Sequence, residues 1–187
     1  CAIGAGPCRE ICALTGASMQ TVTRLCKLGL LEQQEREVLR SPKQELPPPA
    51  EPITLTDEQQ TAFDGLSAQM EREKPGAALL YGVTGSGKTA VYVALIQKAL
   101  DEGRSAMLLV PEIALTPQLL GRMTAHFGKT VAVLHSSLRV GERYDEWRRI
   151  ARGEARVVVG TRSAVFAPLQ SPGLLILDEE QEHTYKS

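Results

Sequence analysis

The stretch Gly82-Val-Thr-Gly-Ser-Gly-Lys-Thr89 decides the fold, because it has the spacing of a phosphate-binding P-loop. The apolar residues 77–81 before it predict a strand, and residues 88–100 after it predict a helix. Its glycines let the loop wrap closely, so that backbone N–H groups point at phosphate oxygens. Lys88 then supplies positive charge to the β- and γ-phosphates, and the Thr89 hydroxyl can ligate Mg²⁺. We therefore predict an ATP site formed by Gly82, Val83, Thr84, Gly85, Ser86, Gly87, Lys88 and Thr89.

Strands and helices alternate through the residues around this loop. Apolar spacing predicts helices over 56–73, 88–100, 115–127 and 142–151, and strands over 77–81, 106–110, 131–134, 156–159 and 174–177. Continuous apolar strands between helices predict an α/β fold, in which helices cover both faces of a parallel sheet. Ligands of such folds bind at the carboxyl ends of the strands, so we expect the functional residues there.

The last predicted strand ends in acids, in the sequence Leu174-Leu-Ile-Leu-Asp-Glu-Glu-Gln181. A carboxylate at Asp178 suits the Mg²⁺ that bridges the phosphates, and Glu179 can orient and polarise the attacking water. Acidic strand ends are common and usually structural, but this one follows a P-loop in the same alternating fold. We therefore predict a Walker B site. Its metal ligands are Thr89 and Asp178, and the catalytic residues are Lys88 and Glu179.

Residues 160–163 form a candidate nucleic-acid contact. Thr161, Arg162 and Ser163 follow a predicted strand, and two hydroxyls with a guanidinium suit a backbone phosphate. An ordinary turn explains the same residues equally well. Elsewhere we expect His135 and Trp147 to be packing residues. The charged run Arg148, Arg149 and Arg152 is expected to be a solvated helix face.

A change of composition divides the chain. Four prolines fall within residues 47–52, which favours extended, semi-rigid backbone and excludes a helix. We therefore predict a small domain over 1–40, a proline-rich linker over 41–54 and the P-loop domain over 55–187.

The small domain has the pattern of a winged helix-turn-helix. A helix is expected over 9–15, with Ile11 and Leu14 facing inward, and a second helix begins after Ser18. A hairpin is expected over 30–39. The second helix would offer Gln20, Thr23, Arg24 and Lys27 to DNA. A helical docking domain with a solvated polar face fits the same pattern.

Composition narrows the class of protein. The net charge of −1 does not by itself indicate nucleic-acid binding, although basic groups can be confined to one groove. No apolar run approaches the ~20 residues of a membrane span, and no signal peptide is visible, so we expect a cytoplasmic protein without membrane contact. No Cys-x-x-Cys pair occurs, so we expect reduced thiols rather than a zinc site at Cys1, Cys8, Cys12 and Cys26. The missing initiator Met suggests a piece of a longer protein.

Five further strings extend the pattern beyond the P-loop and the acidic strand end. They are Leu109-Val-Pro-Glu-Ile-Ala-Leu-Thr-Pro-Gln118, Leu134-His-Ser-Ser-Leu138, Gly141-Glu-Arg143 with Glu146-Trp-Arg-Arg149, and Gly160-Thr-Arg-Ser-Ala164. Together the strings span the P-loop domain and closely resemble the PriA family of bacterial primosomal helicases, which restart stalled replication forks. RecG and the transcription-repair coupling factors, which are related, usually carry an acidic residue at the position of Val83.

The resemblance implies the first RecA-like lobe of a superfamily 2 motor, which uses ATP and Mg²⁺ to move 3′ to 5′ on single-stranded DNA. Branched DNA, primosome proteins and single-strand-binding proteins are the implied partners. Pro111 and Glu112, together with Thr161 and Arg162, would line the DNA path. A second motor lobe and a cysteine-rich zinc-binding region of the family are not among these residues. We therefore expect zinc only outside this chain, and weak nucleotide binding with little hydrolysis by the chain alone.

The resemblance implies a role for Gln59, and the sequence departs from the family pattern at Gln181 and Ala90. Gln59 fits the Leu-Thr-x-x-Gln pattern that contacts adenine in many helicases, and it also fits a capping box with Thr56. The acidic box of the family normally ends in a His that couples hydrolysis to DNA, and Gln181 stands there. Ala90 replaces the family's Glu after the P-loop threonine.

Two other functions compete with a helicase. A DNA-binding regulator that binds ATP but performs no work uses the same motifs. A small-molecule P-loop kinase fits poorly, because it would leave Thr161, Arg162 and the winged helix unused.

Overall fold

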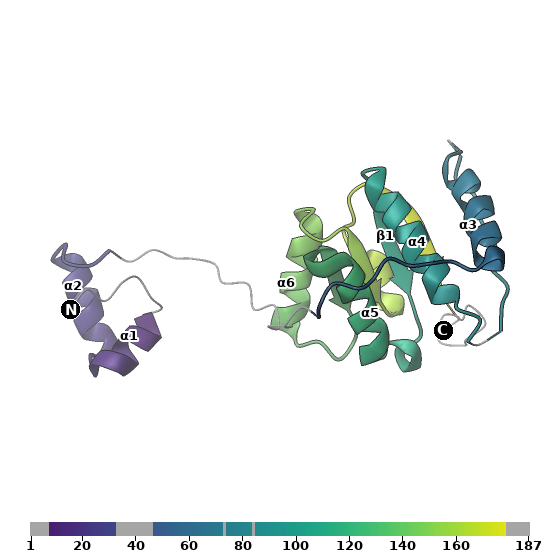
Figure 1. Ribbon diagram of the computed structural model, residues 1–187. Coiled ribbons are helices and arrows are strands. Elements are labelled where there is room, and N and C mark those ends of the chain that lie inside the picture. Colours follow the sequence, from purple (N-terminus) through teal and green to yellow (C-terminus); the bar gives the residue numbers. More distant parts are fainter. Residues whose placement is uncertain (1–7, 33–46, 73, 84, 179–187) are drawn as a thin grey trace. The chain divides into compact units, whose positions relative to one another are not determined.

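The computed structural model describes residues 8–32, 47–72, 74–83 and 85–178 (Figure 1). The chain divides into two compact units, Cys1–Leu39 and Arg40–Ser187, and each is described by itself. No helix in these described ranges is both long and apolar enough to cross a membrane.

The first unit contains two short helices, α1 (Cys8–Thr15) and α2 (Met19–Lys27). Gly16 makes the turn between them with φ +69°, and the Ser18 hydroxyl caps α2 by accepting the Thr21 N–H at 3.2 Å. Both the turn and the cap were expected from the sequence. Val22 is the one buried apolar residue among those described in this unit.

One expectation for the first unit is wrong, and a second lies mostly outside the described residues. Leu14 is 83% exposed, so the prediction that it faces inward is wrong. Among the described residues of this unit, the two short helices do not cover it. The expected hairpin over 30–39 lies outside the described residues from residue 33 onward. The winged-helix assignment therefore stays a prediction.

The second unit is built on a four-stranded, fully parallel sheet in the order β2-β3-β1-β4. The strands are β1 (Ser105–Leu109), β2 (Val131–Leu134), β3 (Val157–Gly160) and β4 (Pro172–Leu177). Its helices are α3 (Asp57–Met70), α4 (Lys88–Asp101), α5 (Pro117–Phe127) and α6 (Val140–Ala151), with short 3₁₀ helices at Glu112–Ala114, Gly128–Thr130 and Arg162–Phe166. This alternation confirms the predicted α/β fold.

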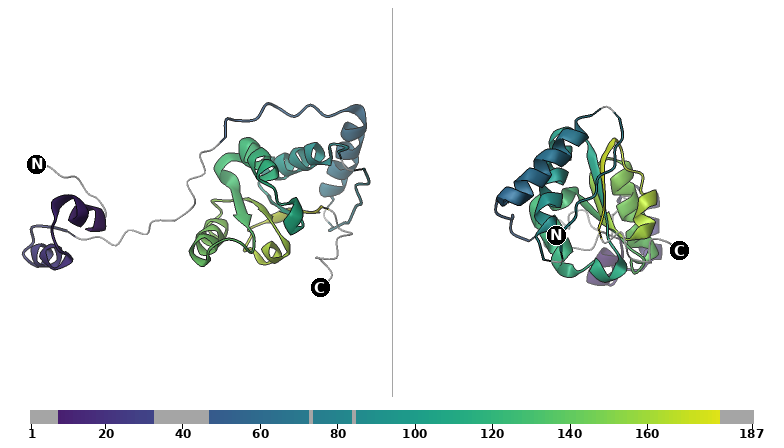
Figure 2. Two further views of the ribbon diagram at one scale, coloured as in Figure 1. Left: turned by 90° about the horizontal axis from the view of Figure 1, so that it is seen from below. Right: turned by 90° about the vertical axis from the view of Figure 1, so that its right-hand side faces the viewer.

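Helices cover both faces of the sheet, as the right-hand view of Figure 2 shows. On one face α4 and α5 bury Ile96 and Met123 against strand residues such as Leu108. On the other face α6 contributes Ile150, which packs with Met107 and Val158. Each strand of the interior therefore alternates between two apolar layers, which explains its continuous apolar sequence.

The expected strand over 77–81 is not present as a paired strand. No hydrogen bond joins its backbone to β4 among the described residues, and Tyr81 is 89% exposed. The segment is instead tied to α3, because the Gln69 side chain donates to the Ala77 carbonyl at 3.2 Å. A β-strand is defined by its hydrogen bonds to a neighbouring strand. This segment has a contact with α3 in their place.

Part of the predicted linker lies against the second unit. The Ala50 N–H donates to the Ala125 carbonyl at the end of α5 at 3.1 Å, and Ile53 packs on the apolar cluster beneath it. Residues 50–53 are therefore held by α5 and the core, as their proline-rich, extended backbone allows.

The predicted solvated face of α6 needs a correction at Arg149. Its side chain is only 16% exposed and forms an ion pair with the buried Glu146 at 2.8 Å. It also donates to the carbonyls of Lys129 and Val131, while Glu146 accepts the Val133 N–H at 3.2 Å. Arg149 thus joins α6 to β2. The prediction failed because helix periodicity does not reveal carbonyls brought alongside from a neighbouring strand.

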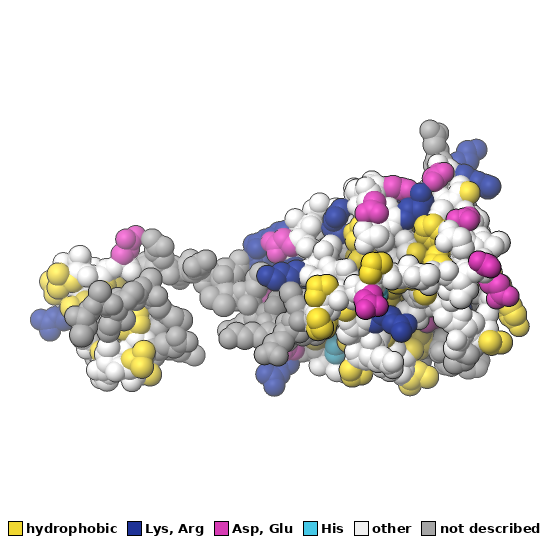
Figure 3. All heavy atoms as spheres, viewed as in Figure 1, with side chains coloured by type: hydrophobic (Ala, Val, Ile, Leu, Met, Phe, Trp, Pro, Cys, Tyr) yellow, Lys and Arg dark blue, Asp and Glu magenta, His cyan; other side chains and the backbone are white. Residues whose placement is uncertain are grey.

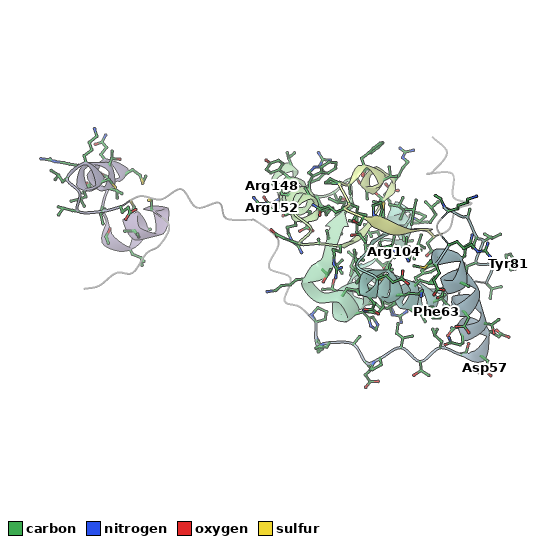
Figure 4. The ribbon with its side chains drawn as sticks, turned by 90° about the horizontal axis from the view of Figure 1, so that it is seen from above. Asp57, Phe63, Tyr81, Arg104, Arg148 and Arg152 are labelled. Atoms are coloured by element: carbon green, nitrogen blue, oxygen red, sulfur yellow. The ribbon has the colours of Figure 1, made fainter. Side chains whose placement is uncertain are left out.

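The other two arginines of the charged run make contacts of their own. Arg148 lies 5.6 Å from the centre of the Tyr144 ring, and Arg152, the C-cap residue of α6, approaches Glu154 at 3.9 Å. Figure 4 labels both arginines. Trp147, expected to be a packing residue, is 39% exposed.

Gly160 is the position where an added methyl group should cost most. A Cβ there would collide with the Leu134 carbonyl oxygen and lie 2.6 Å from the Ala164 Cβ. We expect Gly160→Ala to lower the free energy of unfolding by about 2 kcal/mol through overpacking. Gly65→Ala, in open space on α3, should raise it by about 0.5–1 kcal/mol. Urea unfolding followed by the fluorescence of the single tryptophan tests both, and an unchanged midpoint for Gly160→Ala would contradict the prediction.

Candidate functional site

The carboxyl ends of the strands bring the predicted site residues to one edge of the sheet. Three backbone hydrogen bonds join these ends. The Val110 N–H donates to the Gly160 carbonyl at 2.9 Å, the Thr161 N–H to the Leu134 carbonyl at 3.1 Å, and the Asp178 N–H to the Leu109 carbonyl at 2.9 Å. Residues that follow β1, β3 and β4 therefore lie beside one another, although the sequence separates them widely.

The P-loop closes around its own lysine. The Lys88 ammonium donates to the Gly82 carbonyl at 2.6 Å and reaches the Val83 carbonyl at 3.5 Å. Gly87, with φ +79°, precedes the first residue of α4, so the N-terminus of this helix opens toward the loop. Helix N-termini with left-handed glycines favour anions, which fits a phosphate. Thr84 lies outside the described residues.

Gln59 contacts both α3 and the P-loop. Its Oε1 accepts the Thr56 N–H at 3.0 Å, and the Thr56 hydroxyl accepts the Gln59 N–H at 3.4 Å, which confirms the capping box. Its Nε2 donates to the Ser86 carbonyl at 3.2 Å. A Cβ on Gly87 would collide with that same Nε2. The capping role and a place beside the nucleotide are therefore compatible, while the contact with adenine stays a prediction.

The predicted metal ligands, Thr89 and Asp178, are both hard oxygen donors. Asp178 follows β4, and its Oδ1 accepts a hydrogen bond from the Tyr92 hydroxyl at 2.9 Å. Tyr92 lies three residues after Thr89 on α4, so both side chains share one face of that helix. A threonine hydroxyl and a carboxylate suit Mg²⁺, so these residues fit the ion. Glu179 and Gln181 lie outside the described residues.

Sequence reasoning missed Tyr92. A tyrosine on the buried side of a helix needs a hydrogen-bond partner for its hydroxyl, and this is the signal that could have pointed to it. The partner itself was not predictable, because Asp178 is distant in sequence and meets Tyr92 only across the fold.

The predicted DNA contacts differ in accessibility. Thr161 is 1% exposed and Pro111 is buried, so their side chains pack inside the second unit. Glu112, Arg162 and Ser163 are exposed at the same edge of the sheet. In the first unit, Arg24 and Lys27 are exposed on α2. Exposed side chains are the ones able to meet a nucleic-acid backbone.

Basic and acidic side chains are mixed on the face of the second unit shown in Figure 3. The net charge of the whole chain is −1. On the described part of this face, a contact with DNA would therefore depend on single basic residues rather than on a broad basic field.

The described residues contain no group of three or more His, Cys, Asp or Glu side chains arranged to hold a metal. The thiols of Cys8, Cys12 and Cys26 are free, and Cys1 lies outside the described ranges.

Residues 56–187 match the family described as DEAD/DEAH box helicase, which is more than half of the chain. The chain belongs to the DEAD/DEAH box helicase family. The matched residues begin at the cap of α3 and include the P-loop, the strand ends and the acidic segment. The family therefore accounts for the site assembled above.

Replication restart proteins named PriA are among the relatives of this chain. It is 48% identical over 181 residues to the replication restart protein PriA of Bacillus subtilis, covering 96% of this chain and 22% of that protein. It is 44% identical over 169 residues to PriA of Synechocystis sp., covering 90% and 20%. The resemblance to PriA read from the motifs is thus confirmed. The chain spans about a fifth of the length of these curated relatives.

A solved structure shares the fold. The structure of RecG bound to a three-way DNA junction superposes with a TM-score of 0.57 at 24% identity, covering 67% of this chain and 21% of RecG. This likeness confirms the RecA-like α/β lobe of the helicase.

The two roles of Gln59 can be separated by substitution. Gln59→Glu keeps an acceptor for the Thr56 N–H but cannot donate to the Ser86 carbonyl, and it adds negative charge beside the phosphates. We expect ADP affinity to fall about tenfold, which is about the value of one hydrogen bond, with the melting temperature nearly unchanged. Isothermal titration with ADP measures the effect, and Gln118→Glu on the surface of α5 is the charge control. Wild-type affinity in Gln59→Glu would contradict the prediction.

Proposed function

We propose that this chain is the nucleotide-binding lobe of an ATP-dependent DNA helicase that moves 3′ to 5′ and acts on branched DNA in replication restart. The observation that carries the proposal is the shared edge of the sheet. Asp178 lies at this edge with the exposed Glu112 and Arg162. Its bond to Tyr92 joins it to α4, which begins with Lys88. The chain also matches a helicase family over residues 56–187. The named relatives support the role in replication restart.

The ATP site would work by positioning and by charge. Lys88 would leave the Gly82 carbonyl to neutralise the β- and γ-phosphates, and the N–H groups of the loop would hold their oxygens. Thr89 and Asp178 would hold Mg²⁺, which supplies positive charge between the phosphates when bound. Gln59 would contact adenine. We assign Glu179 to the attacking water, and Gln181 to coupling hydrolysis with DNA.

DNA would bind along the edge of the sheet formed by the carboxyl ends of the strands. The Arg162 guanidinium and the Ser163 hydroxyl suit a backbone phosphate, and Glu112 lies at the same edge. Arg24 and Lys27 would add contacts from the winged helix. Primosome proteins and single-strand-binding proteins in the bacterial cytoplasm are the partners we propose, as the resemblance to the PriA family implies.

An unwinding assay tests this function in the complete gene product that contains these 187 residues. Forked substrates with a single-stranded 3′ or 5′ arm are compared, with ATP and Mg²⁺. ATP-dependent unwinding with 3′-to-5′ polarity supports the proposal. Binding of ATP and of forks without unwinding or DNA-stimulated hydrolysis would replace it with the non-motor regulator.

A further inference from the structure

A buried phenol touches the carboxylate assigned to the metal. Tyr92 is 7% exposed and belongs to the apolar cluster between α4 and the sheet. Its hydroxyl donates to Asp178 Oδ1 at 2.9 Å. The ring is fixed by packing against neighbours such as Val93 and Ile96, so the position of the hydroxyl is fixed as well.

Two contacts hold Asp178 at the end of β4. Its backbone N–H donates to the Leu109 carbonyl at 2.9 Å, and its Oδ1 accepts the hydrogen bond of the Tyr92 hydroxyl. The bond to Oδ1 favours one orientation of the carboxylate, and a buried, packed phenol keeps that orientation constant.

We propose that Tyr92 is a positioning residue that holds Asp178 in the orientation that binds Mg²⁺, an inference that rests on the proposed ATP site. Partners of metal ligands fix the direction of the ligand and tune its strength, and their loss typically costs about 10- to 100-fold in metal affinity. Tyr92 is well placed for this role. It lies one turn beyond Lys88 and Thr89 on α4, so a single helix would carry a phosphate contact, one metal ligand and the support for the other.

The role has a consequence beyond the metal. Because Tyr92 belongs to α4 and Asp178 to the end of β4, their bond fixes the distance between the P-loop helix and the strand that carries the acids. A nucleotide that shifts the start of α4 would be felt at Asp178 through this bond.

The test replaces Tyr92 with Phe in the complete gene product, which removes the hydroxyl and keeps the ring. Mn²⁺ stands in for Mg²⁺, and its binding in the presence of ADP is measured by electron paramagnetic resonance. We expect the Mn²⁺ dissociation constant to rise about tenfold or more. ADP affinity in EDTA and the melting temperature should stay close to wild type. Tyr144→Phe, which changes a 60% exposed tyrosine on α6, is the matched control and should bind Mn²⁺ like wild type.

Each outcome has a definite meaning. Wild-type Mn²⁺ affinity in Tyr92→Phe would overturn the inference and leave the proposed ATP site intact. Loss of ADP binding in EDTA together with a large fall in melting temperature would also overturn it, because Tyr92 would then act only in packing. Failure of the wild-type protein to bind Mn²⁺ with ADP would instead refute the ATP site itself. A rise in the Mg²⁺ concentration needed for half-maximal hydrolysis, at an unchanged maximal rate, would give independent support.

Discussion

Replacing Lys88 with alanine should lower DNA-stimulated ATP hydrolysis about a hundredfold or more in the complete gene product, the usual cost of removing one preorganised group that stabilises charge in the transition state. In the structure the ammonium is held by the Gly82 and Val83 carbonyls at the mouth of α4, where phosphates would displace it. Phosphate release with a forked DNA activator measures the rate.

Two controls make the Lys88 result specific. Lys74→Ala removes an exposed lysine of the same unit and should leave hydrolysis unchanged. The melting temperature of Lys88→Ala should move little, because one partly exposed hydrogen-bonded group contributes only about 1 kcal/mol. Hydrolysis within a fewfold of wild type in Lys88→Ala would mean that the loop does not serve the chemistry assigned to it.

Arg149→Ala should lower the free energy of unfolding of the second unit by about 3 kcal/mol, because it leaves the buried Glu146 carboxylate without its cation. The arginine is held by that carboxylate at 2.8 Å and by two carbonyls of the segment leading into β2. Trp147, the single tryptophan of the chain, is a neighbour on α6, so its fluorescence follows urea unfolding of this unit directly.

Arg152→Ala is the matched control for Arg149. Its ion pair with Glu154 is 3.9 Å long and both side chains are about half exposed, so the change should stay within about 0.5 kcal/mol. Equal effects of the two substitutions would show that the network between α6 and β2 adds nothing to stability.

Local signals predicted most of the second unit. The P-loop fixed the start of α4, and threonine caps explain why α3 begins after Thr56 and α5 after Thr116. The strands follow from short apolar runs, and their parallel order follows from the helices between them. Such features are written within a few neighbouring residues, so the sequence alone contains them.

Features that depend on distant partners escaped prediction. Residues 77–81 have a strand's composition, but Ala77 is bonded to Gln69 of α3 and the segment joins no ladder among the described residues. Arg149 would be expected on the surface, but it donates to the carbonyls of Lys129 and Val131, at the start of β2. The hydroxyl of Tyr92 meets Asp178 only once the sheet has formed. The motifs therefore located the ATP site, while its supporting contacts required the structure.

The central place of β1 has a consequence for synthesis on the ribosome. Among the four strands described, β1 is translated first, yet its two neighbours in the sheet are the last two, β3 and β4. At about 5–20 residues per second, several seconds separate the addition of Leu109 from that of Leu177. Until β3 is made, β1, which is buried along its whole length in the folded unit, has no ladder on either side, and it lacks its second neighbour until β4 follows. This exposure makes the nascent chain a natural client for chaperones. A translational pause placed before residue 172 should lengthen that exposure and lower the yield of soluble protein.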